Sequence, residues 1–193
     1  MSTIRIAAAC AAALFPVAAA AQMTCAQLGV HLSTQQFVQP YTAPGATTPL
    51  PFTQIIGTRC EANFIYSSRG GPRHGYAVGQ DQRIGLRVGF PLNSLDGGVG
   101  GVEGAWNGKV RNIGGGGLQG GLSNVTNATN NGYVGSNTDS GHPSTDNPNF
   151  AVIQETHELN EGRLDDFLNE SLRQQYRWAL RLTKDYYGQR ASQ

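Results

Sequence analysis

Hydrophobic and polar residues alternate more regularly in the segment Arg83–Phe90 than anywhere else in this chain. Ile84, Leu86, Val88 and Phe90 occupy every second position, and arginines and glycines occupy the positions between them. Because side chains of a β-strand point alternately to its two faces, the pattern predicts a strand with one face in a hydrophobic core.

Other segments predict further helices and strands. Residues 123–131 predict a short helix, with Ser123 as N-cap and Gly132 as its stop. Shorter strands are predicted at 61–67, 106–113 and 133–138.

A long helix is predicted from about Arg163 to Tyr187, with Gly188 as its C-terminal cap. Its apolar face is predicted from residues that recur every fourth position: Leu164, Leu168, Leu172, Tyr176 and Leu180. Asp165 and Asp166 fall in its first turn, where the helix dipole favours acids. Strand, glycine loop, helix, strand, loop and long helix together predict an α/β fold.

The amino terminus is typical of a secretory signal peptide over residues 1–21. Arg5 provides the positive region, Ile6–Val17 the apolar segment, and Ala19–Ala21 the small residues before a cleavage site. The alternative is a buried alanine-rich helix. The apolar segment is shorter than a bilayer requires, so we expect no membrane partner and a secreted or periplasmic location.

Charge and cysteine content narrow the functional classes. Loss of residues 1–21 removes one of the 14 basic residues and none of the 13 acidic residues, so the remaining chain has no net charge. This balance argues against a nucleic-acid partner. Two of the three cysteines remain, Cys25 and Cys60. In an oxidising compartment such a pair forms a disulfide, and the alternative is two buried free thiols.

A glycine-rich segment from Ile113 to Gly121 is the strongest candidate for chemistry. Glycines let backbone N–H groups approach an anion without interference from side chains. Gly116 and Gly117 are therefore candidate donors of an oxyanion hole. A flexible loop or tight turn is the competing interpretation of glycines alone, and the segment lacks the Gly-Lys-Ser/Thr of a phosphate-binding loop.

Asp139 and His142 follow the strand predicted at 133–138, and strand ends of α/β sheets gather ligand-binding groups. A carboxylate there could orient an imidazole, but a polar pair that stabilises the loop is the favoured alternative. His157 lies among glutamates without a second histidine at ligand spacing, so we expect no metal site. The basic face formed by Arg173, Arg177 and Arg181 is expected to be solvated, with an acidic partner as the alternative.

From Trp106 onward the sequence resembles the tannase and feruloyl esterase family of secreted serine esterases. The resemblance rests on four motifs: Trp106–Lys109, Gly114–Gly121, Gly132–Val134 with Ser136–His142, and Lys184–Gly188. It covers about residues 83–188 and is loose before them.

The resemblance implies the amino-terminal portion of an α/β-hydrolase sheet with flanking helices, here incomplete. It implies a Ser-His-Asp triad that cleaves small-molecule esters of aromatic acids. No Gly-x-Ser-x-Gly occurs in the sequence. By the resemblance, the nucleophile, the triad acid and histidine, the lid and its calcium site lie beyond Gln193, and no cofactor binds this chain. Only Gly116 and Gly117 take a family role, as oxyanion donors.

These expectations divide the chain into three regions. Residues 1–21 are the signal peptide, 22–80 an amino-terminal extension with the Cys25–Cys60 disulfide, and 81–193 a partial α/β-hydrolase domain. As a separate polypeptide the chain is expected to be an inactive, poorly soluble fragment of the esterase. The rival hypothesis is a secreted noncatalytic module that binds a small ligand or anion at the glycine loop.

Overall fold

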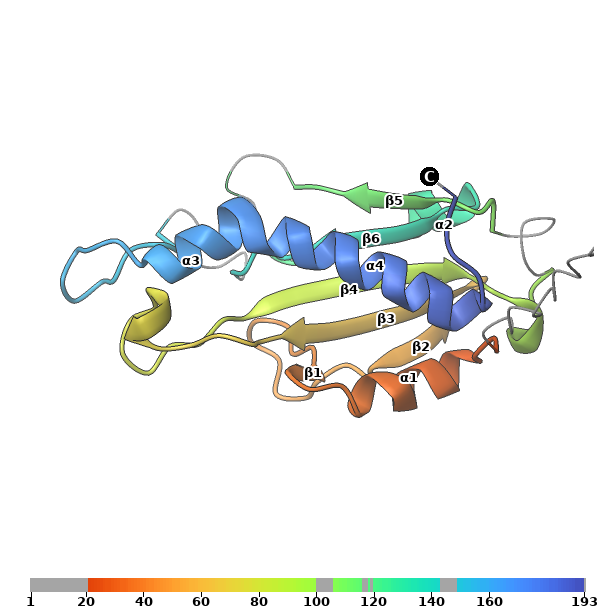
Figure 1. Ribbon diagram of the computed structural model, residues 1–193, viewed down its shortest axis with the longest axis horizontal. Coiled ribbons are helices and arrows are strands. Elements are labelled where there is room, and N and C mark those ends of the chain that lie inside the picture. Colours follow the sequence, from red (N-terminus) through yellow and green to blue (C-terminus); the bar gives the residue numbers. More distant parts are fainter. Residues whose placement is uncertain (1–20, 100–105, 116–117, 119, 143–148, 193) are drawn as a thin grey trace, which may run out of the picture.

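A six-stranded mixed sheet organises the residues that the structure describes (Figure 1). The structure is a computed structural model, and it describes residues 21–99, 106–115, 118, 120–142 and 149–192. Helices flank both faces of the sheet, so the fold class is α/β, as predicted. Nearly all of the predicted signal peptide, residues 1–20, lies outside the described residues.

The sheet has the strand order β1–β3–β4–β6–β5, and β2 pairs with the same strand, β3, as β1 does. Only β5 and β6 run parallel, and all other pairs are antiparallel. The strands are β1 (Val38–Pro40), β2 (Thr53–Ile56), β3 (Arg59–Tyr66), β4 (Ile84–Pro91), β5 (Val110–Ile113) and β6 (Val134–Thr138). Two 3₁₀ turns, Pro72–His74 and Ser94–Asp96, lie in the connections.

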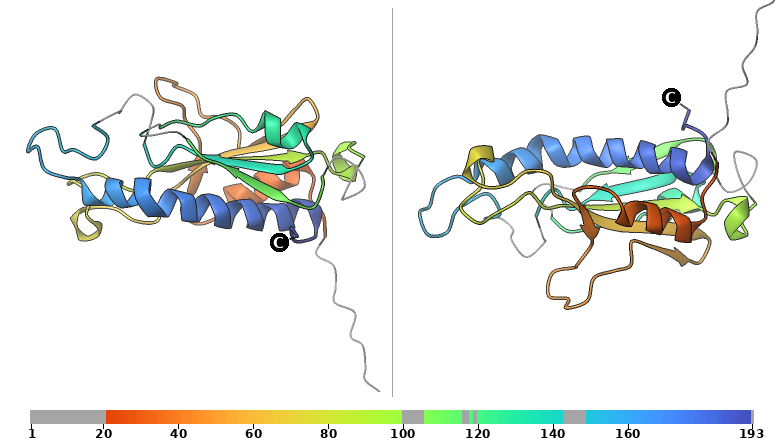
Figure 2. Two further views of the ribbon diagram at one scale, coloured as in Figure 1. Left: turned by 90° about the horizontal axis from the view of Figure 1, so that it is seen from above. Right: turned by 60° about the horizontal axis from the view of Figure 1, so that its bottom comes forward.

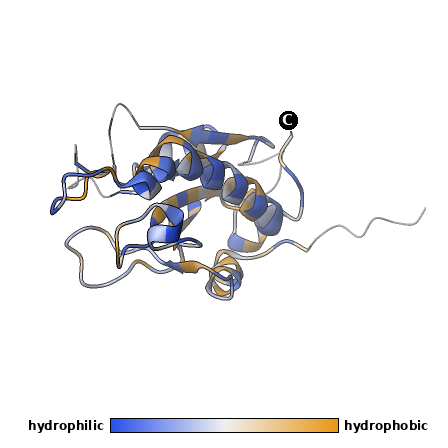
Figure 3. Cartoon of the chain, turned by 60° about the vertical axis from the view of Figure 1, so that its left-hand side comes forward, coloured by the Kyte–Doolittle hydropathy of each residue, from blue (hydrophilic) through white to orange (hydrophobic). Residues whose placement is uncertain are grey.

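The alternation predicted for β4 is confirmed. The two faces of the strand pack against different helices. Its apolar residues are buried toward α1 (Cys25–Ser33) and α4 (Ser171–Tyr187). The glycines between them leave room on the other face, where a Cβ on Gly89 would overlap Val125, next to α2 (Thr126–Asn130). Figure 2 shows α4 and α2 on opposite sides of the sheet, and Figure 3 shows hydrophobic and hydrophilic residues alternating along strands.

The short helix begins later than predicted. Val125, not Ser123, is the N-cap residue of α2, and it makes no side-chain capping bond. Ser123 instead donates its backbone N–H to Oδ1 of Asn137 on β6, at 2.7 Å. The prediction was wrong because a long-range partner in the sheet took the residue that local propensity assigned to the helix.

The long helix is interrupted where the sequence predicted one continuous helix. It consists of α3 (Glu161–Asp165), a π-helical turn (Asp166–Glu170) and α4. The predicted cap is confirmed, because Gly188 has φ of 69° and donates its N–H to Lys184 O at 2.8 Å. A π-turn changes the rotation of the helix, so the residues before and after it do not continue one stripe toward the core.

The apolar stripe predicted for this helix is not its buried face. Leu168, Leu172 and Tyr176 are 55%, 54% and 53% exposed. The face against the sheet instead carries Trp178, Leu182, Tyr186 and Tyr187. Large aromatic side chains bury more apolar area than leucines, and their packing selects this orientation.

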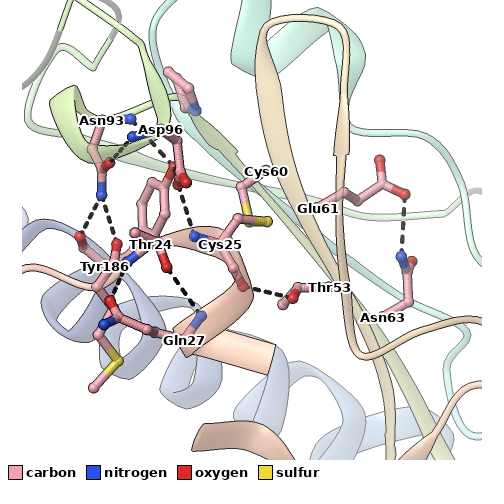
Figure 4. The surroundings of a disulfide bond; sticks show 12 residues. Thr24, Cys25, Gln27, Thr53, Cys60, Glu61, Asn63, Asn93, Asp96 and Tyr186 are labelled. Atoms are coloured by element: carbon pink, nitrogen blue, oxygen red, sulfur yellow. Dashed lines mark hydrogen bonds between the residues drawn. A yellow bond between two sulfur atoms is a disulfide. The ribbon is translucent and has the colours of Figure 1, made fainter. Parts of the chain in front are cut away.

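The disulfide between Cys25 and Cys60 is present, as predicted (Figure 4). It ties α1 to β3. Asp96 strengthens the same corner, because its carboxylate accepts the Cys25 N–H and the Tyr186 hydroxyl, both at 2.7 Å. Asn93 donates its side-chain amide to Met23 O and Tyr186 O. The amino-terminal helix is therefore fixed to the end of α4 and to the sheet.

Candidate active site at the carboxyl ends of β5 and β6

The parallel pair β5 and β6 brings two predicted site segments to one edge of the sheet. Ile113 at the end of β5 is paired with Asn137 near the end of β6. The glycine-rich segment therefore leaves the sheet beside the turn that contains Asp139 and His142. This edge is where α/β sheets place ligand-binding groups.

Direct contacts join these two segments. Gly121 donates its N–H to His142 O at 3.1 Å. A Cβ at Gly120 would overlap the His142 imidazole, so a glycine is required for this close approach. Gly116 and Gly117, the predicted oxyanion donors, lie outside the described residues. Their role stays a prediction.

Asp139 is fully buried and anchors the turn after β6. Its Oδ1 accepts the N–H groups of Gly85, at 2.7 Å, and Gly141, at 3.0 Å. Its Oδ2 accepts Nη1 of Arg83 at 2.9 Å. Burial raises the pKa of Asp139 to about 6, against the opposing effect of Arg83 and the two N–H donors. These contacts fix the turn to β4.

The turn itself has a conformation that glycine and small residues allow. Ser140 has φ of 59° and Gly141 has φ of 81°. A Cβ on Gly141 would approach Cβ of Asp166 to 2.8 Å, so the turn packs directly on the π-helical segment. His142 donates its N–H to Asp139 O at 3.2 Å, which closes the turn.

His142 lies in an aromatic layer beneath the turn. Its ring is buried and stacks on Phe150, with centroids 4.1 Å apart and planes at 10°. Phe167 contacts both rings, at 5.8 Å and 4.8 Å. This environment positions the backbone of the turn and the glycine segment packed on the ring, and it encloses the imidazole away from solvent.

A buried polar network behind the turn was not anticipated from the sequence. Asp166 accepts hydrogen bonds from Tyr76 Oη and Gln82 Nε2, both at 2.7 Å, and from Arg69 Nη2 at 3.0 Å. Burial raises the pKa of Asp166, while its three donors oppose that shift. Asp166 is therefore an internal anchor of the π-turn, not a solvated acid at a helix start.

Asp165, the other acid assigned to the first turn of the helix, faces the same arginine. It accepts Nη1 of Arg69 at 3.0 Å and Nδ2 of Asn169 at 3.0 Å. The hydrogen bond from Asn169, followed by that from Arg69, lowers the pKa of Asp165. Nothing in the local sequence marks Arg69, Tyr76 or Gln82, because their common partner is more than 80 residues away.

A small cavity borders the described end of the glycine segment. It has a volume of about 370 Å³ and is lined on one side by Gly120–Ser123 and on the other by Tyr41, Leu50 and Arg87. Arg87 is held by Oδ1 of Asn63 at 2.7 Å, by Oε1 of Glu61 at 3.2 Å and by Ser123 O at 3.3 Å. The cavity can admit a small group beside the glycine segment.

Residues 102–193 match the family model described as tannase and feruloyl esterase. This region of the chain is similar to the tannase and feruloyl esterase family. The match indicates an esterase-like, hydrolytic function, as the resemblance predicted. No curated protein matches the chain.

The matched region, residues 102–193, is held in place by contacts with the part of the chain that precedes it. Asp139 and Asp166 lie within the match, whereas Arg83, Gly85 and Tyr76, which bind them, precede it. Strands from both parts form one sheet. The region before the match therefore helps to position the tannase-family turn.

Other candidate residues lie on the surface. His157, with φ of 59°, and the neighbouring glutamates are exposed. Within the described ranges, no group of three or more His, Cys, Asp or Glu residues could hold a metal ion. Arg173, Arg177 and Arg181 are exposed along α4, and Arg173 pairs with Glu170 at 3.3 Å. None of the helices described is both long and apolar enough to cross a bilayer.

Proposed function

We propose that this chain forms part of a secreted serine esterase that hydrolyses small esters of aromatic acids. The observation that carries the proposal is the tannase and feruloyl esterase match over residues 102–193, with a glycine segment directly after β5. The disulfide supports an oxidising compartment, secreted or periplasmic. The α/β sheet is compatible with the α/β-hydrolase fold that the resemblance implies.

The proposed chemistry is acyl transfer to water through an acyl-enzyme. A serine hydroxyl attacks the ester carbonyl, and an alkoxide develops on the carbonyl oxygen. The N–H groups of Gly116 and Gly117 are proposed to donate hydrogen bonds to that oxygen. Donors fixed before the reaction stabilise this charge without reorganisation, and removal of one donor costs about 10²–10³ in kcat.

The nucleophile is proposed to reside on a polypeptide segment that this sequence does not contain. Two observations indicate where a strand that carries the nucleophile would join the sheet, beside β5. In the described sheet, β5 has a strand neighbour on one side only, β6. Two residues before β5, Gly108 O accepts the backbone N–H of Ser192 at 2.7 Å and its hydroxyl at 3.0 Å.

A strand that begins at Ser192 and runs parallel to β5 would bring its carboxyl end to the glycine segment. The six steps from Gly108 to Gly114 span roughly 20 Å at about 3.3 Å per residue. A serine at that end would lie beside the proposed oxyanion donors. Without such a strand, the chain alone is proposed to be inactive.

Hydrolysis of a chromogenic hydroxycinnamate ester tests the proposal in two steps. The chain alone should show no turnover above the buffer rate. Co-expression with a polypeptide that carries the nucleophile-bearing remainder of a tannase-family domain should restore turnover. In that assembly Gly116→Pro, which removes an N–H, should lower kcat by about 10²-fold or more.

Gly116→Ala is the matched control, because it keeps the N–H and should retain most of the activity. The same pair of substitutions applies at Gly117. Turnover by the chain alone would exclude a missing nucleophile. Equal activity of the proline and alanine variants in a properly formed assembly would exclude the oxyanion role.

The cavity beside the glycine segment favours the rival hypothesis of a noncatalytic binding module. Arg87 is the charged residue that lines it. A stable, soluble, monomeric chain that binds a small anion, and that gains no activity on complementation, would support that function.

A further inference from the structure

A second, aromatic pocket lies beside α4 at the end of β3, two strands away from β6 in the sheet order. It has a volume of about 320 Å³ and lies between the segment after α1, the end of β3 and the middle of α4. Tyr66 of β3 lines it, and β3 is separated from β6 by β4. The residues that define its character are Gln36, Phe37, Tyr66, Arg177, Trp178 and Arg181.

Phe37 has a backbone conformation that is unfavourable for a residue with a side chain. Its φ is 65°, in the left-handed region that residues other than glycine rarely adopt, and its side chain is 47% exposed. Its carbonyl accepts the N–H of Ser67 at 2.9 Å, and the next residue, Val38, pairs with Tyr66. The sheet thus fixes an exposed aromatic ring at the mouth of the pocket at an energetic cost.

The base of the pocket is also aromatic. The Trp178 ring is nearly buried and meets Tyr66 edge-on, with centroids 6.0 Å apart and planes at 61°. Phe64 packs on the same indole at 5.1 Å. These contacts hold the rings rigid, so a flat apolar group that enters meets a preformed surface.

The charge at the rim has a single sign. Arg181 lies over the Trp178 ring at 5.0 Å and donates to Gln35 Oε1, so its guanidinium is held in place. Arg177 lines the pocket one turn earlier on α4. None of the described residues that line the pocket is acidic. A rigid aromatic surface beside two guanidinium groups suits a planar ligand with a negative charge.

We propose that this pocket binds aromatic carboxylates, with the ring between Phe37 and Tyr66 and the carboxylate at Arg177 and Arg181. Its volume fits one ring and its carboxyl group. The site is distinct from the glycine segment and does not depend on ester hydrolysis by this protein. It would let the protein hold a free aromatic acid apart from its proposed catalytic edge.

Titration of the unmodified chain with benzoate, followed by calorimetry, tests the proposal directly. We expect a single site with a Kd on the order of 1 mM, which suits a ligand of this size. Benzamide, which has the same ring without the charge, should bind at least about tenfold more weakly. Absence of benzoate binding, equal binding of benzamide, or preferential binding of a neutral sugar such as xylose would overturn the proposal.

Variants locate the site. Arg177→Gln should weaken benzoate about tenfold, whereas Arg173→Gln, the same change one turn earlier on α4, should leave the affinity unchanged. Phe37→Gly should also weaken binding, yet it should not lower the melting temperature, because glycine adopts positive φ without strain. A loss of stability equal to the loss of binding would indicate a purely structural Phe37.

Trp178 offers an independent readout of the same binding event. The chain has two tryptophans, and Trp106→Phe leaves Trp178 as the single indole. Benzoate should then change the emission of Trp178 with the same Kd. An unchanged emission in a folded Trp106→Phe variant would place the ligand elsewhere and overturn the assignment.

Discussion

Two residues at the end of β6, Asp139 and Gly141, show how the candidate site depends on single side chains. Asp139 joins the turn to Gly85 and Arg83, and Gly141 allows the turn to lie against Asp166. Both act through close packing at a buried position. Each supports a prediction about stability that requires no substrate.

Gly141→Ala should destabilise the fold by about 2–3 kcal/mol. The residue has φ of 81°, and the added Cβ would lie 2.8 Å from Cβ of Asp166. Gly97→Ala is the matched control, since Gly97 also has φ of 81° but has no atom within 4 Å of the added Cβ. Urea unfolding measures both. Equal losses would show that backbone strain alone, and not the contact with the π-turn, accounts for the cost.

Asp139 should make stability depend on pH between about 4 and 6. Its pKa is raised to about 6 from 3.8, so the folded state binds the proton more tightly than the unfolded state. The free energy of unfolding should therefore fall as pH rises through this range, by about 3 kcal/mol from this residue. Asp166 contributes in the same direction.

Comparison with Asp139→Asn isolates the effect of Asp139, because asparagine does not titrate. Unfolding by urea from pH 4 to pH 7 should show a smaller slope in this variant than in the parent. Glu155→Gln, which removes a carboxyl group at an exposed position, is the control for loss of a charge elsewhere. Parallel curves for the parent and Asp139→Asn would contradict the raised pKa.

At the scale of elements, the disulfide and the capping contacts attach α1 to the sheet. The bridge closes a loop between residues separated by 35 positions. Thr24 and Gln27 form a capping box at the start of the same helix. The helix is short and mostly solvated on its outer side, so its attachment depends on these links and on Leu28 and Leu32.

Replacement of both Cys25 and Cys60 by serine should lower the free energy of unfolding by about 3–4 kcal/mol. In the chain-entropy model, loss of the bridge restores the freedom of this loop in the unfolded state. Denaturant unfolding of the double variant and of the oxidised parent measures the difference. Reduction of the parent should reproduce the loss, and an unchanged stability would mean that the bridge is not formed in solution.

For the whole molecule, two surface features favour self-association: an exposed apolar stripe on the π-turn and α4, and the edge of β5, which has one strand neighbour in the described sheet. The stripe consists of Leu168, Leu172 and Tyr176. Beside it, a cavity of about 770 Å³ lies between α4 and β5 and is lined by Val110 and Leu180, among others. The same cavity also carries Arg181, Lys184 and Arg190, so the apolar surface available for association is mainly the exposed stripe.

The chain is therefore expected to self-associate, and the triple variant Leu168→Gln, Leu172→Gln, Tyr176→Gln should reduce this tendency without a loss of stability. Sedimentation velocity at increasing concentration, together with thermal unfolding, checks both parts. Leu182→Gln is the contrasting change, because Leu182 is fully buried and should cost about 3 kcal/mol or more. A parent that stays monomeric at high concentration would contradict the prediction.

Local patterns predicted several elements correctly. The alternation along β4 depends on a period of two within eight residues, and the cap at Gly188 depends on its own φ. The pairing of Cys25 with Cys60 followed from the cysteines outside the predicted signal peptide. The motifs from Trp106 onward were enough to predict the tannase and feruloyl esterase family.

The sequence by itself thus determined the α/β class, the main elements and the family similarity of residues 102–193, because short-range periodicity and motifs encode these features. Tertiary structure alone decided which face of α4 is buried, the π-turn, and the partners of Asp139 and Asp166. Apart from Gly141, which follows Asp139 in the same turn, those partners lie 54 to 97 residues away in the chain. They meet only because β3, β4 and β6 pair side by side, and no local pattern carries that register.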